Sequence, residues 1–249
     1  MHNTPLLRVN KLQRSYGKLF AVQNISFDLQ KGEVLGFLGP NGAGKSTTMQ
    51  MLSGVLAPDA GEIMVDGIDI ASQPIKAKSR IGYLPETPPL YPDLTVQEYL
   101  VYAARLHRVS GPDISQAVQR VMEQCNLLQH TKKLIGNLSK GYQQRVGIAQ
   151  AIVHKPDIIL LDEPTNGLDP IQIREIRTLI QQLGQEHAII LSSHILPEVE
   201  SSCSRVLILN NGAIVFSEQM ENLEQHSLER VFIELTCGEQ QTNEHRVAG

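Results

Sequence analysis

Hydrophobic and polar positions alternate along the N-terminal third of the chain. Residues 6–9 and 21–29 alternate apolar with polar side chains, which is typical of half-buried strands. Two further short apolar runs, 63–65 and 68–70, flank Asp66-Gly67, a dipeptide that favours a tight hairpin turn. The pattern therefore predicts mainly antiparallel strands in this part of the chain.

Helical periodicity replaces this alternation in the middle of the chain. Thr95 and Glu98 have the spacing of a capping box ahead of an apolar helical pattern. A second helix is predicted from residue 112, with apolar side chains three and four positions apart. Ser139 is placed to cap a third helix. The segment 84–155 is therefore predicted to be an inserted helical subdomain.

Buried strands and helices alternate after residue 156. The apolar runs 158–161 and 188–191 show no alternation, as expected of strands buried on both faces. Between them, Asp169 is placed to cap a helix that has Pro170 at its first position. Such an order predicts a parallel sheet covered by helices on both faces. Residues 221–249 are expected to form a polar tail whose last ten residues are disordered.

The composition narrows the choice of partners. The 22 Lys and Arg residues against 26 Asp and Glu residues give a formal net charge of -4, and Trp is absent. A mildly acidic chain with few aromatic side chains to stack on bases gives no reason to expect nucleic acid binding. Its cysteines, Cys125, Cys203 and Cys237, form no C-x-x-C pair, which indicates a reduced, cytosolic protein with free thiols.

The sequence also shows no signal for secretion or membrane insertion. Residues 1–5 lack the basic and apolar regions of a signal peptide. No apolar run approaches the roughly 20 residues that a membrane-spanning helix needs. If a membrane is involved in the function, another chain is expected to cross it.

The most specific pattern follows a buried strand and opens a helix. Residues 39–46 fit G-x-x-x-x-G-K-[ST], between the apolar run 34–38 and a helix predicted over 47–53 that Gly54 ends. Glycines let successive backbone N–H groups turn inward around a phosphate, and the helix start adds unpaired donors. The expected nucleotide-binding residues are Gly39, Pro40, Asn41, Gly42, Ala43, Gly44, Lys45, Ser46 and Thr47.

Four polar side chains are expected to carry the phosphate chemistry. Lys45 would reach the β- and γ-phosphates, and the Ser46 hydroxyl would bind Mg²⁺. Asp162 ends an apolar strand, where it would hold Mg²⁺ through water. Glu163 follows it and can orient and polarise the water that attacks the γ-phosphate. A strand that ends in Asp-Glu-Pro could also merely begin a turn. This set predicts a nucleoside triphosphate and Mg²⁺ as cofactors, and the family resemblance described next implies that the nucleotide is ATP.

Five motifs in series closely resemble the ABC-type ATPases. They are the phosphate loop, Leu160-Leu161-Asp162-Glu163-Pro164, Gly167-Leu168-Asp169, Ser193-His194 and the segment 137–145, and the resemblance runs from about residue 6 to residue 217. It implies an α/β fold with a P-loop (RecA-like) parallel core sheet, an N-terminal antiparallel β subdomain and an inserted α-helical subdomain. One domain is expected over residues 1–220, with the catalytic core in 6–83 and 156–217.

The segment 137–145 departs from the family pattern Leu-Ser-Gly-Gly-Gln at Lys140 and Tyr142, but it retains Ser139 and Gly141. In the family, this signature at a helix start contacts the γ-phosphate held by the other subunit of a head-to-tail dimer. The resemblance thus implies a contact in trans from Ser139, Lys140, Gly141, Tyr142 and Gln143. It implies a place for Asp169 in a loop at the dimer interface. Taken alone, Ser139 would be an ordinary helix N-cap.

Three more positions take roles from the resemblance. Tyr16, predicted to lie in a loop over residues 15–17, stands where the family has an aromatic residue that stacks on adenine, although it could equally pack on the sheet. His194, a catalytic residue like Glu163, would hydrogen-bond the γ-phosphate and help hold the catalytic geometry. Glu86 replaces the Gln that senses Mg²⁺ and the attacking water in most of the family. A carboxylate there can also bind Mg²⁺, but it adds negative charge near the phosphates.

The resemblance predicts the ATPase subunit of a membrane transporter. Residues 81–100 look like the branch that serves ABC-2-type exporters, so the expected partners are an ABC-2-like permease subunit and a second ATPase subunit, identical or paired. The chain would lie in the cytoplasm, attached to the membrane through the permease. An ABC-type ATPase acting on DNA or ribosomes and a regulatory module without turnover are the alternatives. The absence of Asn-Lys-x-Asp in the sequence disfavours a GTPase.

The proline-rich segment 85–99 is the expected docking surface for the permease. Its four prolines suppress regular structure, and Leu90, Tyr91 and Leu94 would be partly exposed on it. The alternative is that these three side chains simply pack on the helix that begins at Thr95.

Overall fold

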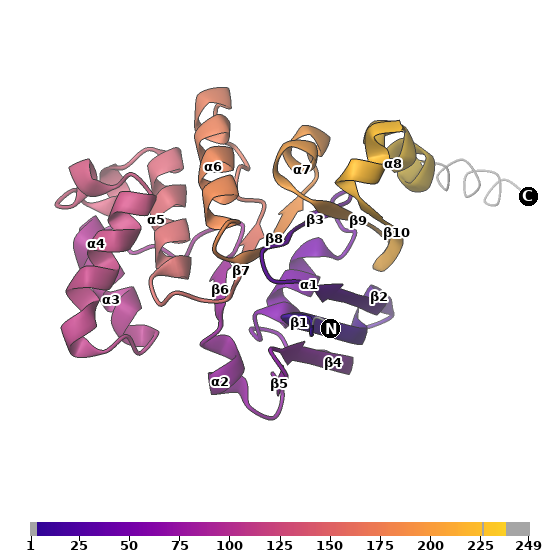
Figure 1. Cartoon of the computed structure of the whole chain (residues 1–249), viewed down its shortest axis with the longest axis horizontal. Helices are drawn as coiled ribbons and strands as arrows, with labels where there is room; N and C mark the ends of the chain where they lie inside the picture. The colour runs from indigo at the N-terminus through magenta and orange to yellow at the C-terminus, as the bar shows by residue number, and fades with distance from the viewer. Residues whose placement is uncertain (1–3, 226, 238–249) are drawn as a thin grey trace, which may run out of the picture.

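Two sheets and the helices around them make up the computed structural model, which describes residues 4–225 and 227–237. The smaller sheet is antiparallel with the strand order β2-β1-β4-β5. The larger sheet has the order β10-β9-β3-β8-β7-β6. Figure 1 shows α1 (Lys45–Leu52) between the two sheets, in contact with strands of both. The predicted α/β fold, with a parallel core sheet and an antiparallel subdomain, is confirmed.

The antiparallel sheet is built from the alternating segments of the N-terminal third. Its strands are β1 (Leu7–Tyr16), β2 (Leu19–Leu29), β4 (Ala60–Val65) and β5 (Ile68–Asp69). The expected hairpin at Asp66-Gly67 joins β4 to β5. The expected loop over residues 15–17 is wrong, because β1 continues through Tyr16, which pairs with Leu19 across a two-residue turn. Gly17 permits that tight turn with its φ of 62°.

The core sheet is parallel except at one edge. Its strands are β3 (Val34–Leu38), β6 (Ile81–Leu84), β7 (Ile158–Asp162), β8 (Ala188–Ser193), β9 (Arg205–Asn210) and β10 (Ala213–Gln219). Only β10 runs antiparallel to its neighbour. Every residue of β3, β7 and β8 is buried, as expected of parallel strands covered on both faces.

Successive residues of the core strands enter two different hydrophobic clusters, since neighbouring side chains of a strand point to opposite faces. Leu35 of β3 and Leu160 of β7 face the antiparallel sheet and α1. Leu38 and Leu161 face the helices on the other side. The core sheet therefore separates two apolar layers.

The helices on the second face include all the α-helices of the segment 84–155. They are α3 (Val96–Leu106), α4 (Ile114–Gln124), α5 (Lys140–Ile152), α6 (Pro170–Leu183) and α7 (Leu196–Ser202), joined by the 3₁₀ turns Gly111–Asp113, Leu128–His130 and Ile135–Asn137. On the other side, α2 (Pro74–Lys78) precedes β6. The capping box of Thr95 and Glu98 opens α3 as expected.

Helix α5 joins the helical segment to the core sheet. An added Cβ at Gly82 of β6 would lie 2.1 Å from the Ala151 carbonyl oxygen of α5, so the two backbones touch. Side chains of α3, α4, α5, α6 and the core strands belong to one hydrophobic cluster. The segment 84–155 thus shares its apolar core with the larger sheet.

The expected polar tail from residue 221 is wrong for its first part. The 3₁₀ turn Met220–Gln225 and helix α8 (Leu228–Cys237) follow β10, and Leu223 and Leu228 are buried. Helix α8 lies against α7 and β9, and Asn210 donates a hydrogen bond to the Leu235 carbonyl. Apolar side chains at helical spacing make α8 amphipathic, although the sequence on either side of it is mostly polar. The last ten residues, predicted to be disordered, lie outside the described residues.

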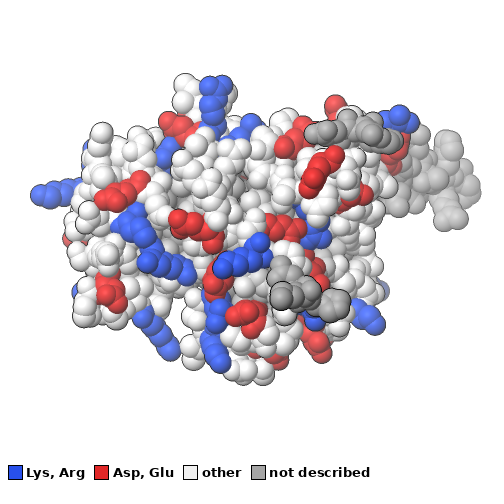
Figure 2. Space-filling view, in the orientation of Figure 1, with Lys and Arg blue, Asp and Glu red and all other residues white. Residues whose placement is uncertain are grey.

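None of the helices in residues 4–225 and 227–237 is both long and apolar enough to cross a membrane. Figure 2 shows Lys and Arg side chains interspersed with Asp and Glu over the face in view. That face offers no extended surface of one charge.

Candidate functional site

The expected ATP site lies where β3, β7 and β8 end. A hollow of about 810 Å³ opens there, beside the start of α1. Among its lining residues are Tyr16, Asn41, Gly42, Ala43, Gly44, Lys45, Ser46, Thr47, Glu86, Glu163 and His194. Ligand sites of parallel sheets occur at this carboxyl edge. The structure thus brings together residues from sequence positions 16 to 194 in one cavity.

The phosphate loop is packed closely against two other segments. Gly44 has a φ of 97°, and an added Cβ would lie 2.3 Å from the Ala21 carbonyl oxygen. An added Cβ at Gly39 would lie 2.4 Å from the Leu209 carbonyl oxygen. A side chain at either position would displace backbone. Helix α1 begins at Lys45, two residues before the predicted start.

Lys45 lies under this loop and is 6% exposed. Its ammonium donates to the Gly39 carbonyl at 2.8 Å and to the Pro40 carbonyl at 3.3 Å. The same nitrogen is 3.4 Å from Oε1 of Glu163. A buried cation is therefore held between the phosphate loop and the end of β7.

Asp162 is buried beside the first turn of α1. The hydroxyls of Ser46, at 3.1 Å, and Ser192 donate to its Oδ1 atom. Burial raises the pKa of the Asp162 carboxyl above its usual range. The hydroxyl donors lower this pKa, whereas the nearby carboxylates of Glu163 and Glu86 raise it. A cation near Asp162 would relieve this crowding of carboxylates.

Glu163 has a left-handed backbone, with a φ of 47°, that turns its side chain back into the site. Its amide donates to the Ser192 hydroxyl at 3.0 Å. Its carboxylate, 6% exposed as a residue, lies between the Lys45 ammonium and His194. Nδ1 of His194 is 2.8 Å from Oε2 of Glu163, and because a carboxylate only accepts, Nδ1 carries the proton.

Glu86 is tied to a residue that the sequence patterns did not single out. Asn166 donates from Nδ2 to Oε1 of Glu86 at 2.8 Å, and both side chains line the hollow. The Asn166 amide therefore satisfies one oxygen of the carboxylate that replaces the family's Gln. Asn166 lies three positions after Glu163, and this short separation is the sequence feature that could have indicated its place in the site.

Tyr16 stands at the open end of the hollow and is 49% exposed, so it is not packed into the sheet. The Arg14 guanidinium lies 5.2 Å from the centre of its ring. Leu19 and Phe20 also line the hollow and are more exposed than Tyr16. These two apolar residues were missed, although a hairpin that ends in exposed apolar side chains could have indicated them.

The signature segment does not line the hollow. Ser139 precedes α5 and is exposed, and its side chain makes no capping hydrogen bond. The Lys140 side chain lies over Gly167, where an added Cβ would be 2.2 Å from the ammonium nitrogen. Gln143 donates to the carbonyls of Ile135 and Leu138. Within one chain, these residues and Tyr142 are separate from the phosphate loop.

Asp169 and Gly141 have clear local contacts. The Asp169 carboxylate accepts from the amides of Ile171 and Gln172 and so caps α6, as predicted. An added Cβ at Gly141 would lie 2.6 Å from the Gln172 side chain. The start of α5 therefore packs directly on the start of α6.

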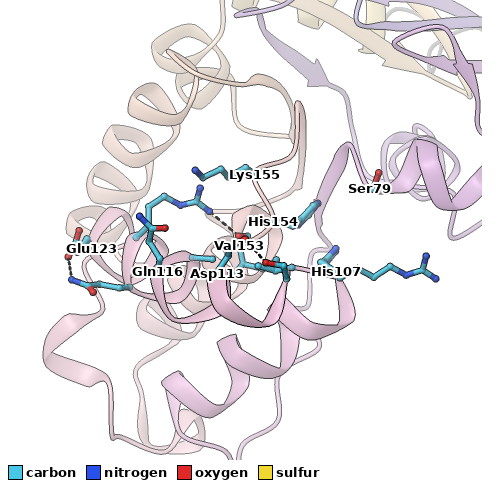
Figure 3. A pocket seen from close by; sticks show the side chains of 14 residues that line it. Ser79, His107, Asp113, Gln116, Glu123, Val153, His154 and Lys155 are labelled. Atoms are coloured by element: carbon cyan, nitrogen blue, oxygen red, sulfur yellow. Dashed lines mark hydrogen bonds between the residues drawn. The ribbon is translucent and has the colours of Figure 1, made fainter.

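A second hollow, of about 800 Å³, lies between α4 and the end of α5 and contains none of the predicted site residues. Figure 3 shows His107 and His154 side by side in its wall, and their rings stack at 3.9 Å. Burial, together with His107, Arg120 and His187, lowers the pKa of His154 to about 3, although a hydrogen bond to the Ile81 carbonyl opposes this shift. The two rings therefore stack as neutral groups at neutral pH.

Comparisons with known proteins agree with the resemblance. Residues 22–166 match the family model described as ABC transporter. The chain is 37% identical over 237 residues to the bacitracin transport ATP-binding protein BcrA of Bacillus licheniformis, covering 94% of this chain and 76% of that protein. It is 33% identical over 228 residues to the Nod factor export ATP-binding protein I of Ralstonia nicotianae, covering 91% and 71%. A solved ATP-binding subunit of an ABC transporter superposes with a TM-score of 0.82 at 30% identity, covering 92% of this chain and 99% of that one.

Proposed function

The chain belongs to the ABC transporter family, and from this premise we propose that it is the ATP-hydrolysing subunit of an exporter. Its ATPase activity would drive a separate membrane-spanning permease. The observation that carries the proposal is the position of Glu163, between Lys45 and His194 and next to the Asp162–Ser46 pair. This arrangement brings together a side chain that can bind phosphate (Lys45), one that can bind a metal ion (Ser46) and a base (Glu163).

ATP would bind with its phosphates against the loop 39–46. Backbone amides at the start of α1 would supply donors, and Lys45 would supply a positive charge for the β- and γ-phosphates. Tyr16 lies at the open end of the hollow, where its exposed ring can stack on the adenine. Leu19 and Phe20 add apolar surface at that end.

The residues around Asp162 fit a Mg²⁺ ion. Asp162 is 2% exposed and forms no ion pair with Lys, Arg or His in the described part of the chain. In residues 4–225 and 227–237, no three His, Cys, Asp or Glu side chains form a metal site by themselves. Magnesium would thus depend on nucleotide oxygens and water together with Ser46, Asp162 and Glu86. The ion would neutralise charge that develops on the phosphates.

Glu163 is the proposed general base. Its carboxylate can take a proton from a water molecule aimed at the γ-phosphate, and His194 holds it by donating from Nδ1. When both ring nitrogens are protonated, Nε2 of the same imidazolium can donate to the γ-phosphate. The contacts with Lys45 and His194 therefore hold the Glu163 carboxylate in the orientation that would activate the water.

The proposed active unit is a head-to-tail dimer. Ser139 presents an exposed hydroxyl at the start of α5, and this hydroxyl does not cap its own helix. Together with Lys140, Gly141, Tyr142 and Gln143 it would contact the nucleotide held by another subunit. The loop that ends at Asp169 lies against the start of α5, through the Lys140–Gly167 contact, and would line the same interface.

The proposed permease contact is the segment 85–99. Tyr91 is 51% exposed, and its ring stacks edge-on against Tyr102 at 5.7 Å. Leu90 and Leu94 are partly buried and pack against the hydrophobic cluster, and the Tyr91 ring also contacts Tyr99 and Tyr102 of α3, as in the packing alternative, while about half of Tyr91 stays exposed. Because one relative is described as a bacitracin transport protein and another as a Nod factor export protein, export through an ABC-2-like permease is proposed for this chain too. The chain would then lie at the cytoplasmic face of the membrane.

The proposal is tested by Glu163→Gln. The amide keeps the size of the side chain but cannot act as a base, so ATP binding should persist while turnover falls by about 10²- to 10⁴-fold. Trapped ATP should then stabilise a dimer that is visible by size-exclusion chromatography. The exposed strand residue Glu62 supplies the control variant Glu62→Gln, which should behave like the wild type. Wild-type turnover in Glu163→Gln would refute the assignment.

A further inference from the structure

A buried carboxylate outside the hollow holds two segments of the site. Glu198 of α7 is 2% exposed. Its Oε1 atom accepts a hydrogen bond from the Thr165 hydroxyl, and its Oε2 atom accepts one from the Ser193 hydroxyl at 2.7 Å. In the described part of the chain Glu198 forms no ion pair with a basic side chain. The two hydroxyls are therefore its side-chain hydrogen-bond donors.

Those two hydroxyls belong to the segments that carry Glu163 and His194. Thr165 lies two residues after Glu163, beyond the end of β7, and Ser193 directly precedes His194 at the end of β8. The Ile195 amide also donates to the Ser193 hydroxyl, at 3.0 Å, so this hydroxyl bridges backbone and carboxylate. Glu198 thus connects the two chain segments whose side chains meet 2.8 Å apart.

We infer that Glu198 is a positioning residue for ATP hydrolysis, which sets the separation of Glu163 and His194 through Thr165 and Ser193. The inference rests on the function proposed above for Glu163 and His194. A buried carboxylate that loses one donor keeps the cost of its desolvation, so both hydroxyls are held firmly in place. A displacement of about 1 Å in catalytic geometry can cost about 100-fold in rate.

A purely structural role for Glu198 predicts a different result. If the carboxylate only held α7 on the sheet, its loss would lower the melting temperature and leave the kcat of the folded protein unchanged. A positioning role changes kcat without changing the KM for ATP, because Thr165, Ser193 and Glu198 do not line the hollow. The conservative variant at Thr165 separates the two roles further.

The decisive variants are Thr165→Val, which removes the hydroxyl at constant shape, and Thr165→Ser, which retains it. We expect Thr165→Val to lower kcat about tenfold with the KM for ATP within twofold, and Thr165→Ser to restore kcat. Thr178→Val is the matched control, since among the described residues the Thr178 hydroxyl donates only to the Arg174 carbonyl on α6. Glu198→Gln should resemble Thr165→Val, and the double variant should cost no more than the larger single effect.

A second readout needs no turnover. The imidazole resonances of His194 in the protein without nucleotide, followed by NMR, should shift in Thr165→Val and stay in place in Thr178→Val. Wild-type kcat and unshifted His194 resonances in folded Thr165→Val would overturn the inference. If Thr165→Val does not fold, Ser193→Ala and Glu198→Gln decide by the same two measurements. Wild-type turnover in Glu163→Gln would instead refute the proposed function, whereas a Glu163-dependent ATPase insensitive to Thr165→Val refutes only the positioning role.

Discussion

Among single residues, Lys45 links the two halves of the site. Its ammonium bonds the loop carbonyls of Gly39 and Pro40 and also approaches Glu163. The same cation thus serves the proposed phosphate site and lies beside the proposed base. Removal of this side chain should therefore weaken the binding of ATP, whatever its effect on the rate of hydrolysis.

Lys45→Ala should therefore lose affinity for ATP. A charge-assisted contact to phosphate contributes about 1.5–3 kcal/mol, so the dissociation constant should rise by about 10- to 100-fold. The measurement is a direct binding titration with a fluorescent ATP analogue. Lys31→Ala, in the exposed turn before β3, is the control and should bind as the wild type does. Unchanged affinity in Lys45→Ala would count against its role.

Residues of the site differ in how far the sequence could predict them. The phosphate loop, Asp162 and Glu163 are set by local patterns, because a strand end and a helix start fix their neighbours in sequence. Ser192 lies 30 positions from Asp162 and reaches it only because β8 pairs with β7. Such a contact depends on strand order, which no local pattern encodes.

Helices and strands were predicted correctly where one hydrophobic periodicity dominates a segment of the sequence. The apolar runs of β3, β7 and β8 and the capping box of α3 gave elements close to the observed ones. Helix α8 was missed because mostly polar residues flank this short apolar stretch, whose apolar stripe becomes meaningful only once β9 and α7 offer a surface to pack against.

The stacked histidines at the end of α3 and α5 should make stability depend on pH. His154 is neutral in the folded protein, with a pKa of about 3, but titrates near 6.5 when unfolded. Below pH 6.5 the unfolded chain binds more protons, so the free energy of unfolding falls as the pH falls, by up to about 1.4 kcal/mol per pH unit. His154→Gln should flatten this dependence between pH 6.5 and pH 4 in urea unfolding. Equal slopes for wild type and variant would contradict the prediction.

In the whole molecule, the separation of Ser139 from the phosphate loop predicts complementation between subunits. Mixing Ser139→Arg subunits with Lys45→Ala subunits should produce heterodimers with one intact site and one doubly broken site. Steady-state ATPase activity should then rise above that of either variant alone, provided that one site turns over by itself. Chemically linked heterodimers that bind ATP at neither site would exclude a shared site.

The surface at Tyr91 can be tested in the assembled transporter. With Cys125, Cys203 and Cys237 replaced, Tyr91→Cys should cross-link to a cytoplasmic loop of the permease, and the yield should change with ATP. The half-exposed ring at this position shows that a thiol there is accessible to a partner. Full labelling of the thiol by a bulky reagent without loss of coupled ATPase activity would rule out docking at this point.

The division of the core by its parallel sheet has a consequence for local opening. Strands β3, β7 and β8 contribute side chains to both apolar layers, whereas the hairpin of β1 and β2 belongs to one layer and ends in exposed residues. Backbone amides of the shared strands can exchange with solvent only when both layers separate, so they should be the last to take up deuterium. The nucleotide would thus bind where the slowest-exchanging strands end, while the hairpin proposed to contact the adenine would open locally by itself.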